Sequence, residues 1–549
     1  MEQVSLQVPA PSRRRVINIL GPSLGTALEW YDFFLYGAVA SVIASHFFSA
    51  TDANLAFIYS LATFATGFAV RPLGAAIFGS IGDRWGRKRT FLLTMTLMGV
   101  ATVSIGLIPS EATIGLAAPL LLIATRVLQG LAMGGEYGGA IVYVAEQAPS
   151  KSRGLHTSFV QITATAGLVL ALLAVFSVRR IVGEDDFLSW GWRIPFLLSA
   201  LLFLVSIWVR MRLQESAAFT GLVARGEVAK APLREAIGSR GNVSRMALAL
   251  FGLLAGMTCV WYTSQFYALF YLERVIGLDG ATTSLLVATA LVAACPAFVF
   301  FGWLSDWIGR KPVILAGCLL ALMTYPLLFN ALSEAANPRR AAAIAATRIV
   351  VTADASRCTS QFDLLGTGRA STSCDIARGV LAKAGIPYTL RDTSGSEASV
   401  RIGDVPIAVI DGSLPASDVA GQRAGFTHRL NSALAAQGFP AKADPAAVDH
   451  FRIVIILIIM MLYATMCYGP VAAALCELFP THLRYTSVSL PYNLATGIIG
   501  GFLPASAFAI VAATGNPQAG LWYPMTFITI TVVVGGLFWK DRRPHSLDL

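Results

Sequence analysis

Two acidic side chains interrupt the first apolar stretch of the chain. Glu29 and Asp32 stand three residues apart, and Tyr36 follows one helical turn later, so a helix would place all three on one side. If that helix enters a bilayer near Ile17, the carboxylates lie about 18 to 22 Å along it, close to the bilayer centre. Carboxylates at that depth are costly and usually face a cavity or an ionic partner. We predict that Asp32 and Glu29 bind and release a proton, with an acid that only fixes helix packing as the alternative.

A later apolar stretch carries the complementary charge. Arg126, Gln129, Met133 and Glu136 recur at intervals of three and four residues, which aligns them along one stripe of a helix. A guanidinium presents paired N–H donors that match a carboxylate, so Arg126 and Gln129 are predicted to bind a small anion. Glu136 is a third candidate for carrying a proton. The glycines that alternate with this stripe are expected to allow close approach of a neighbouring helix.

Further polar and aromatic residues interrupt other apolar stretches. Tyr262, Gln265 and Tyr468 lie inside their stretches, whereas aromatic residues that anchor a helix at the membrane surface lie at its ends. Together with Tyr36, they are predicted to line a pocket and to hydrogen-bond its ligand. Arg71 is an additional intramembrane cation, for which a structural partner and a contact with the ligand are equal alternatives.

The composition identifies the kind of chain that positions these residues. Hydrophobic residues make up 55% of the 549 residues, charged residues only 13%, and the mean hydropathy is +0.65, which is typical of a polytopic membrane protein. The net charge of +10 is assigned to basic loops beside the membrane, so no nucleic-acid partner is predicted. A spanning helix needs about 20 mostly apolar residues. Twelve stretches meet this need: 17–45, 54–80, 90–109, 115–146, 155–178, 190–210, 245–272, 281–305, 311–332, 451–475, 486–512 and 520–540.

Two repeated strings divide the chain into related halves. The string G-x3-D-x2-G-R-K begins at Gly79 and again at Gly302. A second pattern, E-x2-P-x3-R, begins at Glu146 and again at Glu477. The copies of the second pattern lie further apart than those of the first, and the excess nearly equals the length of the polar stretch 338–449. The stretch 338–449 is therefore an insertion into an otherwise regular repeat.

The predicted fold is an all-α membrane protein of twelve transmembrane helices in two pseudo-symmetric six-helix bundles, with a small α/β insert between helices 9 and 10. Five divisions follow: an N-terminal bundle at 1–208, a linker at 209–244, helices 7 to 9 at 245–337, the insert at 338–449, and helices 10 to 12 with the tail at 450–549.

The distribution of lysine and arginine sets the orientation. These residues crowd the even-numbered junctions and both termini, so the termini and the linker 209–244 are predicted to be cytoplasmic and the insert to be periplasmic or extracellular. Within the insert we expect a strand from 348, helices over 375–384 and 417–437, a strand over 388–391 and a hairpin over 398–410. Cys358 and Cys374 would then lie in an oxidising space and form a possible disulfide, which the sequence leaves open.

The repeated turns bring acidic and basic residues together at the cytoplasmic face. Each half supplies an acid and an arginine from its turn and a second acid and arginine from the E-x2-P-x3-R pattern. We predict two charge networks that form a gate, because ion pairs of this kind hold in one state and break in another. The first comprises Asp83, Arg87, Glu146 and Arg153, and the second Asp306, Arg310, Glu477 and Arg484; solvated loop charges are the alternative.

Together these motifs resemble the major facilitator superfamily, and more narrowly its metabolite:proton symporter branch, which includes permeases for shikimate, α-ketoglutarate, citrate and proline/betaine. The repeated turn is similar to that of the superfamily. The strings E-W-Y-D-F-F-L-Y-G at 29–37, R-x2-Q-G at 126–130, G-G-E-x-G-G at 134–139 and P-T-H-L-R-Y-T-S at 480–487 resemble the narrower branch. The resemblance covers nearly everything except 338–449, which typical members lack. It implies a central cavity lined mainly by helices 1, 4, 7 and 10, with Glu29, Asp32, Arg126 and Glu136 at or near it.

The expected function is proton-coupled import of a small organic acid or related metabolite by alternating access. The protein is expected to be a monomer in the lipid bilayer of the cell (inner) membrane, and its small-molecule substrate is expected to be anionic. It is expected to have no enzymatic activity, no metal and no cofactor other than the coupled proton. Two alternatives stay open: efflux or exchange of a drug-like or aromatic compound, and a receptor that senses a ligand through the 338–449 module.

Overall fold

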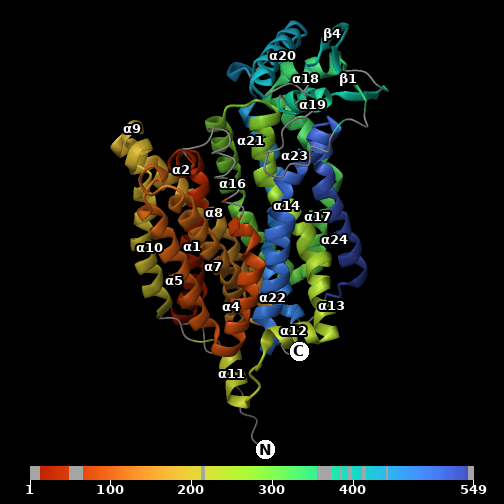
Figure 1. Cartoon of the computed structure of the whole chain (residues 1–549). Helices are drawn as coiled ribbons and strands as arrows, with labels where there is room; N and C mark the ends of the chain where they lie inside the picture. Colours follow the sequence, from red (N-terminus) through yellow and green to blue (C-terminus); the bar gives the residue numbers. More distant parts are fainter. Residues whose placement is uncertain are drawn as a thin grey trace, which may run out of the picture.

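The structure is a computed structural model that describes residues 13–48, 63, 66–211, 215, 217–354, 358, 372–383, 386–393, 398–410, 416–440 and 443–541. A long helical bundle carries a small α/β unit at one end, which we call the module end (Figure 1). The linker helices α11 (Ala217–Arg225) and α12 (Pro232–Gly238) lie at the opposite end of the bundle. That end also carries the two glycine turns of the repeated string, and we call it the turn end.

The first half and the linker form one series of helices, broken by short turns. These helices are α1 (Arg13–Ala38), α2 (Ala40–Phe47), α4 (Arg71–Trp85), α5 (Arg87–Leu107), α6 (Glu111–Ile114), α7 (Ala117–Gln147), α8 (Arg153–Val182), α9 (Glu184–Asp186) and α10 (Arg193–Met211), followed in the linker by α11 (Ala217–Arg225) and α12 (Pro232–Gly238).

The second half repeats this arrangement around the inserted module. Its helices are α13 (Arg240–Ala249), α14 (Ala255–Tyr262), α15 (Ala268–Phe270), α16 (Gly280–Ile308), α17 (Arg310–Ala336), α21 (His450–Leu478), α22 (Arg484–Asn493), α23 (Leu503–Thr514) and α24 (Trp522–Phe538). Two π-helical turns, η3 (Leu250–Leu254) and η4 (Thr263–Tyr267), join α13, α14 and α15, and a third, η5 (Tyr271–Val275), follows α15. A fourth π-helical turn, η9 (Leu494–Gly500), follows α22.

Many of these helices are apolar enough to cross a membrane. A helix also satisfies its own backbone hydrogen bonds, which a segment in lipid must do. Among the described residues, eight helices pass tests of length and composition, or nine if the pair Glu184–Gly191 and Arg193–Trp208, bent by 63°, counts as one span. Helices α1, α4, α22 and α23 lie in the same bundle. The class, a mostly helical multi-pass membrane protein, is confirmed; the count of twelve stays a prediction, since much of 54–80 lies outside the described residues.

The repeated string folds identically in both halves. Gly86 ends α4 and precedes α5 with φ at +101°, and Gly309 ends α16 and precedes α17 with φ at +105°. Residues with a Cβ rarely adopt such angles, whereas glycine does so readily. The shared spacing therefore produces one tight turn per half, and each turn presents an acid shortly before the next helix begins.

The inserted unit is a four-stranded sheet with helices around it. Strands β1 (Ile349–Ala353), β2 (Thr389–Asp392), β3 (Ser399–Ile402) and β4 (Val405–Ala408) lie in the order β2-β1-β3-β4, parallel between β1 and β2 and antiparallel elsewhere. Val351 pairs with Leu390 on one side and with Val400 on the other. With helices α18 (Pro338–Ala346), α19 (Ser373–Lys383) and α20 (Ala416–Ala436), these strands bury a core separate from those of the bundle. The predicted strands, hairpin and helices of the module are confirmed.

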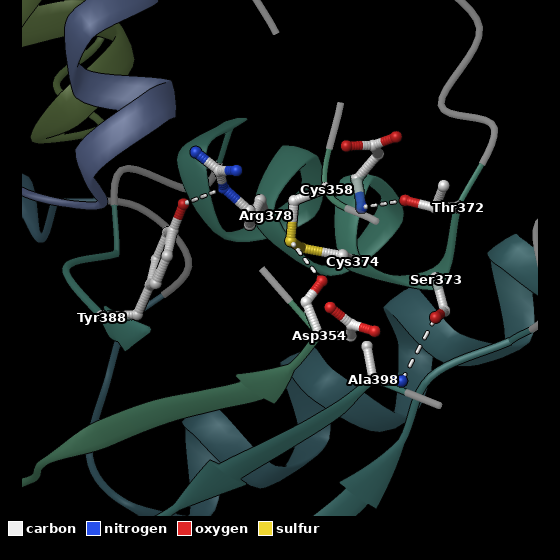
Figure 2. Close-up of a disulfide and its surroundings, with 9 residues drawn as sticks. Asp354, Cys358, Thr372, Ser373, Cys374, Arg378, Tyr388 and Ala398 are labelled. Atoms are coloured by element: carbon white, nitrogen blue, oxygen red, sulfur yellow. Dashed lines mark hydrogen bonds between the residues drawn. A yellow bond between two sulfur atoms is a disulfide. The ribbon is translucent and has the colours of Figure 1, made fainter. Parts of the chain in front are cut away.

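A disulfide joins Cys358 to Cys374 at the start of α19 (Figure 2). One turn further along α19, Arg378 Nε donates a hydrogen bond of 3.1 Å to the Tyr388 hydroxyl oxygen. Burial raises the pKa of this hydroxyl above its ordinary value, and the nearby Arg378 charge opposes that rise. The cross-link fixes α19 to Cys358, which follows β1, and the hydrogen bond fixes it to Tyr388, which precedes β2.

The module rests on the second half of the bundle. Tyr388 N donates to Gly515 O (3.0 Å) in the loop before α24, and its ring covers Gly515, where a Cβ would meet the ring at 2.7 Å. Ala443 N donates to Gly277 O (3.1 Å) in the loop before α16. Because these contacts involve loops of the second half, the module is fixed to that half.

Candidate functional site

Arg71 begins α4 and is buried at mid-bundle, with 1% of its surface exposed. Its guanidinium carbon lies 5.5 Å from the ring centroid of Trp30 and 5.2 Å from those of Phe33 and Phe68. No side chain or carbonyl of the described residues accepts a hydrogen bond from this guanidinium, and its Nε is sealed from solvent. A buried cation without an anionic partner is costly, and rings can offset only part of that cost.

Arg71 lines a small cavity to which both halves of the chain contribute. The lining residues are Trp30, Arg71, Tyr137, Val160, Gln161 and Ala164 from the first half and Trp261, Tyr262, Tyr468, Tyr492 and Thr496 from the second. About 20 Å³ is open to the centres of water-sized molecules, enough for one or two waters. The cavity must therefore expand before it can hold a metabolite.

The cavity walls combine stacked rings with directed polar groups. The rings of Tyr137 and Tyr492 stack across the two halves with centroids 3.9 Å apart. The Tyr137 hydroxyl donates to the side-chain oxygen of Gln161 (3.0 Å), which leaves the Gln161 amide N–H groups without an acceptor in the described structure. Arg71 and Gln161 thus supply unused donors to one cavity, an arrangement suited to an anion.

The seventh predicted segment, 245–272, contributes to the cavity at the π-helical turn η4. Tyr262 is the last residue before this turn, and Trp261 precedes it. Turns of this kind are frequent at functional sites because they redirect side chains. Tyr262 donates from its hydroxyl to the Thr496 carbonyl oxygen at 3.3 Å, and Thr496 lies in another π-helical turn, η9. The two interrupted helices therefore meet at the cavity.

Arg126 occupies a different environment, inside the first half. Its Nη1 donates to the Gln129 side-chain oxygen at 2.5 Å, and Gln129 Nε2 donates to Thr102 Oγ1 at 2.7 Å. The Thr102 hydroxyl in turn donates to the Met98 carbonyl oxygen at 3.0 Å, whereas Asp32 accepts a hydrogen bond of 2.6 Å from Ser199 Oγ. The buried arginine and the buried carboxylate therefore bond to different neutral side chains.

The remaining predicted residues of the first half are also buried away from the cavity lining. The Arg126 guanidinium lies over the Tyr36 ring, 4.5 Å from its centroid. Glu136 accepts hydrogen bonds from Thr26 Oγ1 (3.3 Å) and Thr94 Oγ1 (3.1 Å), which joins α7 to α1 and α5. Glu29 lies on α1 with 4% of its surface exposed.

At the turn end, each half caps a helix of the other. Asp83, in the first turn, accepts hydrogen bonds from the backbone N–H groups of residues 485–486 (3.2 and 2.9 Å), at the start of α22. Asp306, in the second turn, accepts from those of residues 154–155 (2.9 Å each), at the start of α8. A carboxylate at a helix N-terminus is stabilised by the helix dipole, so the two caps join the halves symmetrically.

Two ion pairs between the halves follow the same symmetry. Arg153 Nη1 lies 3.0 Å from Glu477 Oε1, and Arg484 Nη1 lies 3.2 Å from Glu146 Oε1. The predicted networks were different, since each arginine was placed with the acid of its own half. The exchange has a physical reason: the starts of α8 and α22, which carry the two arginines, each pack against the turn of the opposite half.

Within the second half, the structure contains the predicted pairing of Arg310 with Asp306 and Glu477. Arg310 Nη1 lies 2.6 Å from Asp306 Oδ1, and Arg310 Nη2 lies 3.2 Å from Glu477 Oε1. Glu477 thus bridges an arginine of each half. The side chain of Arg87, the counterpart of Arg310, lies outside the described part of the structure.

The structure brings some of the predicted pocket residues to the cavity and separates others from it. Tyr262 and Tyr468 line the cavity, whereas Gln265 is buried without lining it. Arg126, Gln129 and Tyr36 form the separate group inside the first half. Sequence reasoning missed Trp30, Tyr137, Gln161 and Tyr492 and left the role of Arg71 open. For Arg71 a signal existed: it is a cation in an apolar stretch with no acid three or four residues away.

The structure therefore defines a multi-pass membrane protein whose two related halves share a cavity and are joined by ion pairs at the turn end. The chain belongs to the major facilitator superfamily, in its group of metabolite transporters. Two family models match it: the "Sugar (and other) transporter" model over residues 19–250 and the "MFS/sugar transport protein" model over residues 139–365.

Relatives and solved structures support this assignment. The chain is 37% identical to the shikimate transporter of Escherichia coli over 319 residues, 57% of this chain and 72% of that one. It is 36% identical to the proline/betaine transporter of Salmonella typhimurium over 310 residues, 55% of this chain but only 61% of the relative. The fold is similar to that of the proton:xylose symporter XylE, with a TM-score of 0.59 at 14% identity and 98% coverage of both chains.

Proposed function

We propose that this protein imports a small organic anion together with a proton. The observation that carries the proposal is the Arg71 guanidinium, buried without a hydrogen-bond acceptor among the described residues in a cavity shared by the two halves. A bound carboxylate supplies the missing partner in the bidentate geometry that a guanidinium favours. Proline, betaine and shikimate, after which the relatives are named, all contain a carboxylate, which makes them suitable first probes.

The proton is assigned to Asp32, with Glu29 and Glu136 as further candidates. Asp32 is buried in α1, and the Ser199 hydroxyl group donates to it. Helix α1 also carries Trp30, which lines the cavity. A change in the charge of Asp32 therefore acts on the helix that forms one cavity wall, which couples protonation to the space available for the anion.

Alternating access follows from the gate at the turn end. The caps at Asp83 and Asp306 and the two ion pairs between the halves hold this end closed. Rocking of the halves breaks these contacts and opens the cavity at the turn end. From the basic residues at that end we assign it to the cytoplasm, the module to the periplasmic or extracellular side, and the protein to the inner membrane as a monomer.

Reconstituted vesicles test the transport proposal. With the outside more acidic, the wild-type chain is expected to accumulate labelled shikimate, proline or betaine, and collapse of the gradient with a protonophore should release it. Asp32→Asn should lose gradient-driven accumulation yet keep exchange of labelled for unlabelled substrate. Glu334→Gln, which breaks an exposed ion pair with Arg452, is the matched control. Full accumulation by Asp32→Asn would remove Asp32 as the coupling group.

The same vesicles separate the two alternatives. Gradient-driven exit of an aromatic compound, with no accumulation of any carboxylate, would favour efflux over import. Replacement of 338–449 by a short linker distinguishes the receptor: unchanged uptake makes the module an accessory to transport. A ligand that binds the module of a chain with no measurable flux would contradict the import proposal.

A further inference from the structure

A second pocket lies at the turn end, outside the transport cavity. It is formed where α13, α17, α21 and α24 meet in the second half, and about 190 Å³ is open to the centres of water-sized molecules. The lining residues are Arg245, Leu248, Arg310, Ala474, Glu477, Leu478, Phe538, Trp539, Lys540 and Asp541. It is much larger than the cavity around Arg71, and its lining combines cations with apolar side chains.

The cations of this pocket exceed its acids. Glu477 is already shared between Arg310 and Arg153, so Asp541 is the remaining acid. Neither Arg245 nor Lys540 forms an ion pair with any described residue. Two unneutralised cations that face one acid create a positive site, and a site of this size has room for a phosphate group.

Arg310 adds a buried contribution to the same site. Its guanidinium is completely buried, with Nη1 and Nη2 bonded to Ser305, Asp306 and Glu477. Its Nε has no acceptor among the described residues. An anion in the pocket therefore lies beside a cation whose position is already fixed, which lowers the entropy lost on binding.

The apolar residues of the lining indicate that the pocket lies at the membrane surface. Leu248, Leu478 and Phe538 supply apolar contacts, and Phe538 and its neighbour Leu537 are 67% and 72% exposed at the end of α24. Lys311 Nζ holds the following segment by donating to Gly536 O and Trp539 O, both at 2.7 Å. Tryptophan and exposed apolar residues at a helix end are typical of the lipid headgroup region.

We infer that this pocket binds a phosphate-bearing anion, with Arg245 and Lys540 neutralising the phosphate beside Arg310. The apolar wall favours an anionic phospholipid, whose acyl chains cover Leu248 and Phe538 while its headgroup enters the pocket. Free phosphate shares the headgroup chemistry without the chains. The inference is independent of the transported substrate, because none of its residues lines the transport cavity.

The test measures the unfolding temperature of the full-length chain in mixed micelles. A ligand that binds the folded state raises that temperature by mass action. We expect phosphatidylglycerol to raise it above phosphatidylcholine with the same acyl chains, and R245Q/K540Q to weaken the apparent affinity about tenfold or more. The control R234Q/R240Q removes two exposed cations from the same end and should leave the affinity unchanged.

The remaining results identify the source of the phosphate or overturn the site. Stabilisation by millimolar inorganic phosphate that equals that by phosphatidylglycerol supports the site with a soluble ligand, and stabilisation by the lipid alone supports a headgroup. Equal losses in R245Q/K540Q and R234Q/R240Q would show general surface electrostatics and overturn the inference. Undiminished lipid stabilisation of R245Q/K540Q overturns it as well. Native mass spectrometry of retained lipid checks each variant that folds less well.

Discussion

Arg71 and Arg126, two of the arginines buried in the first half, differ in their hydrogen bonding. They are 1% and 0% exposed, and both face the ring of Phe33, at 5.2 and 4.9 Å. Arg126 donates to Gln129, and Gln129 donates in turn to Thr102. Arg71 has no acceptor within the described structure and lines the cavity between the halves. Burial alone therefore does not distinguish a structural cation from one that awaits a ligand; hydrogen bonding does.

Because of this difference in hydrogen bonding, loss of Arg71 and loss of Arg126 should change the stability of the folded protein in opposite directions. A buried guanidinium that lacks a partner destabilises the folded state by several kcal/mol before compensation. Each ring near Arg71 offsets about 0.5 to 2 kcal/mol, so part of the cost remains. Arg126, by contrast, satisfies the Gln129 oxygen, and its loss would leave that buried oxygen without a donor. Ligand binding should therefore need Arg71 and folding should need Arg126.

The largest effect is expected for Arg71→Met. The side chain keeps its approximate length but loses its charge, so an anion loses two charge-assisted hydrogen bonds of about 1.5 to 3 kcal/mol each. Affinity for the transported anion should fall by about 100-fold or more. At the same time the ligand-free variant should unfold at a higher temperature than the wild type, because an uncompensated charge has been removed. Calorimetry of ligand binding and thermal unfolding measure both changes.

Arg71→Met thus tests both the role of Arg71 in anion binding and its effect on the stability of the ligand-free protein. Arg71→Met with unchanged anion affinity would exclude Arg71 from the binding site. A lower unfolding temperature without ligand would show that Arg71 has a stabilising partner in the protein. Arg71→Lys is the matched control, since it keeps the charge without the planar fork and should retain part of the affinity.

Arg126→Met should change stability in the reverse direction. The Gln129 side-chain oxygen, fully buried, loses its donor at a cost of about 1 to 3 kcal/mol. We expect a lower unfolding temperature, measured in the same buffer as for Arg71→Met. The double variant Arg126→Met/Gln129→Met removes both partners and should recover part of the loss. Equal stability of Arg126→Met and wild type would contradict the structural role.

The sequence predicted the fold through its periodic features. Twelve apolar stretches, a string repeated once in each half and a polar interruption at 338–449 indicated two related halves and an insert. These signals are local, because a turn is set by a few neighbouring residues and a spanning helix by the apolar length of its own stretch. The helix at 375–384 and the hairpin over 398–410 were found for the same reason, and appear as α19, β3 and β4.

The site was harder to predict because it depends on contacts between the halves. The sequence places Arg126 on a stripe with Gln129 and Glu136, but it does not show that the Gln129 side-chain oxygen accepts a hydrogen bond from the Arg126 guanidinium. The cavity pairs Tyr137 with Tyr492, which come from opposite halves of the chain. The exchange of Arg153 and Arg484 between acids of opposite halves has the same origin. Without the packing of one half on the other, each residue had several equivalent partners.

A smaller effect is expected for Thr102→Val, which tests the hydrogen bonds that hold Gln129 beside Arg126. Valine has the shape of threonine but cannot accept the hydrogen bond from Gln129 Nε2. The buried amide then lacks an acceptor, which costs about 1 to 3 kcal/mol and lowers the unfolding temperature. Anion affinity should stay within twofold of wild type, since Thr102 does not line the cavity. Ser199→Ala, which removes the hydrogen bond to Asp32, serves for comparison.

The smallest effect is expected for Gln161→Glu, which should give the Arg71 guanidinium a carboxylate partner within the protein. The glutamate keeps an oxygen for the Tyr137 hydroxyl but replaces the unused amide donor with an acceptor in the same small cavity as Arg71. A carboxylate there neutralises the guanidinium, so the ligand-free protein should gain about 1 kcal/mol of stability and lose about tenfold in anion affinity. Gln161→Met, which adds no charge, separates loss of the donor from neutralisation: it should weaken binding without raising the unfolding temperature. If Gln161→Glu binds the anion as tightly as wild type, Arg71 and Gln161 do not share one ligand, and the distinction between the two arginines loses its functional meaning.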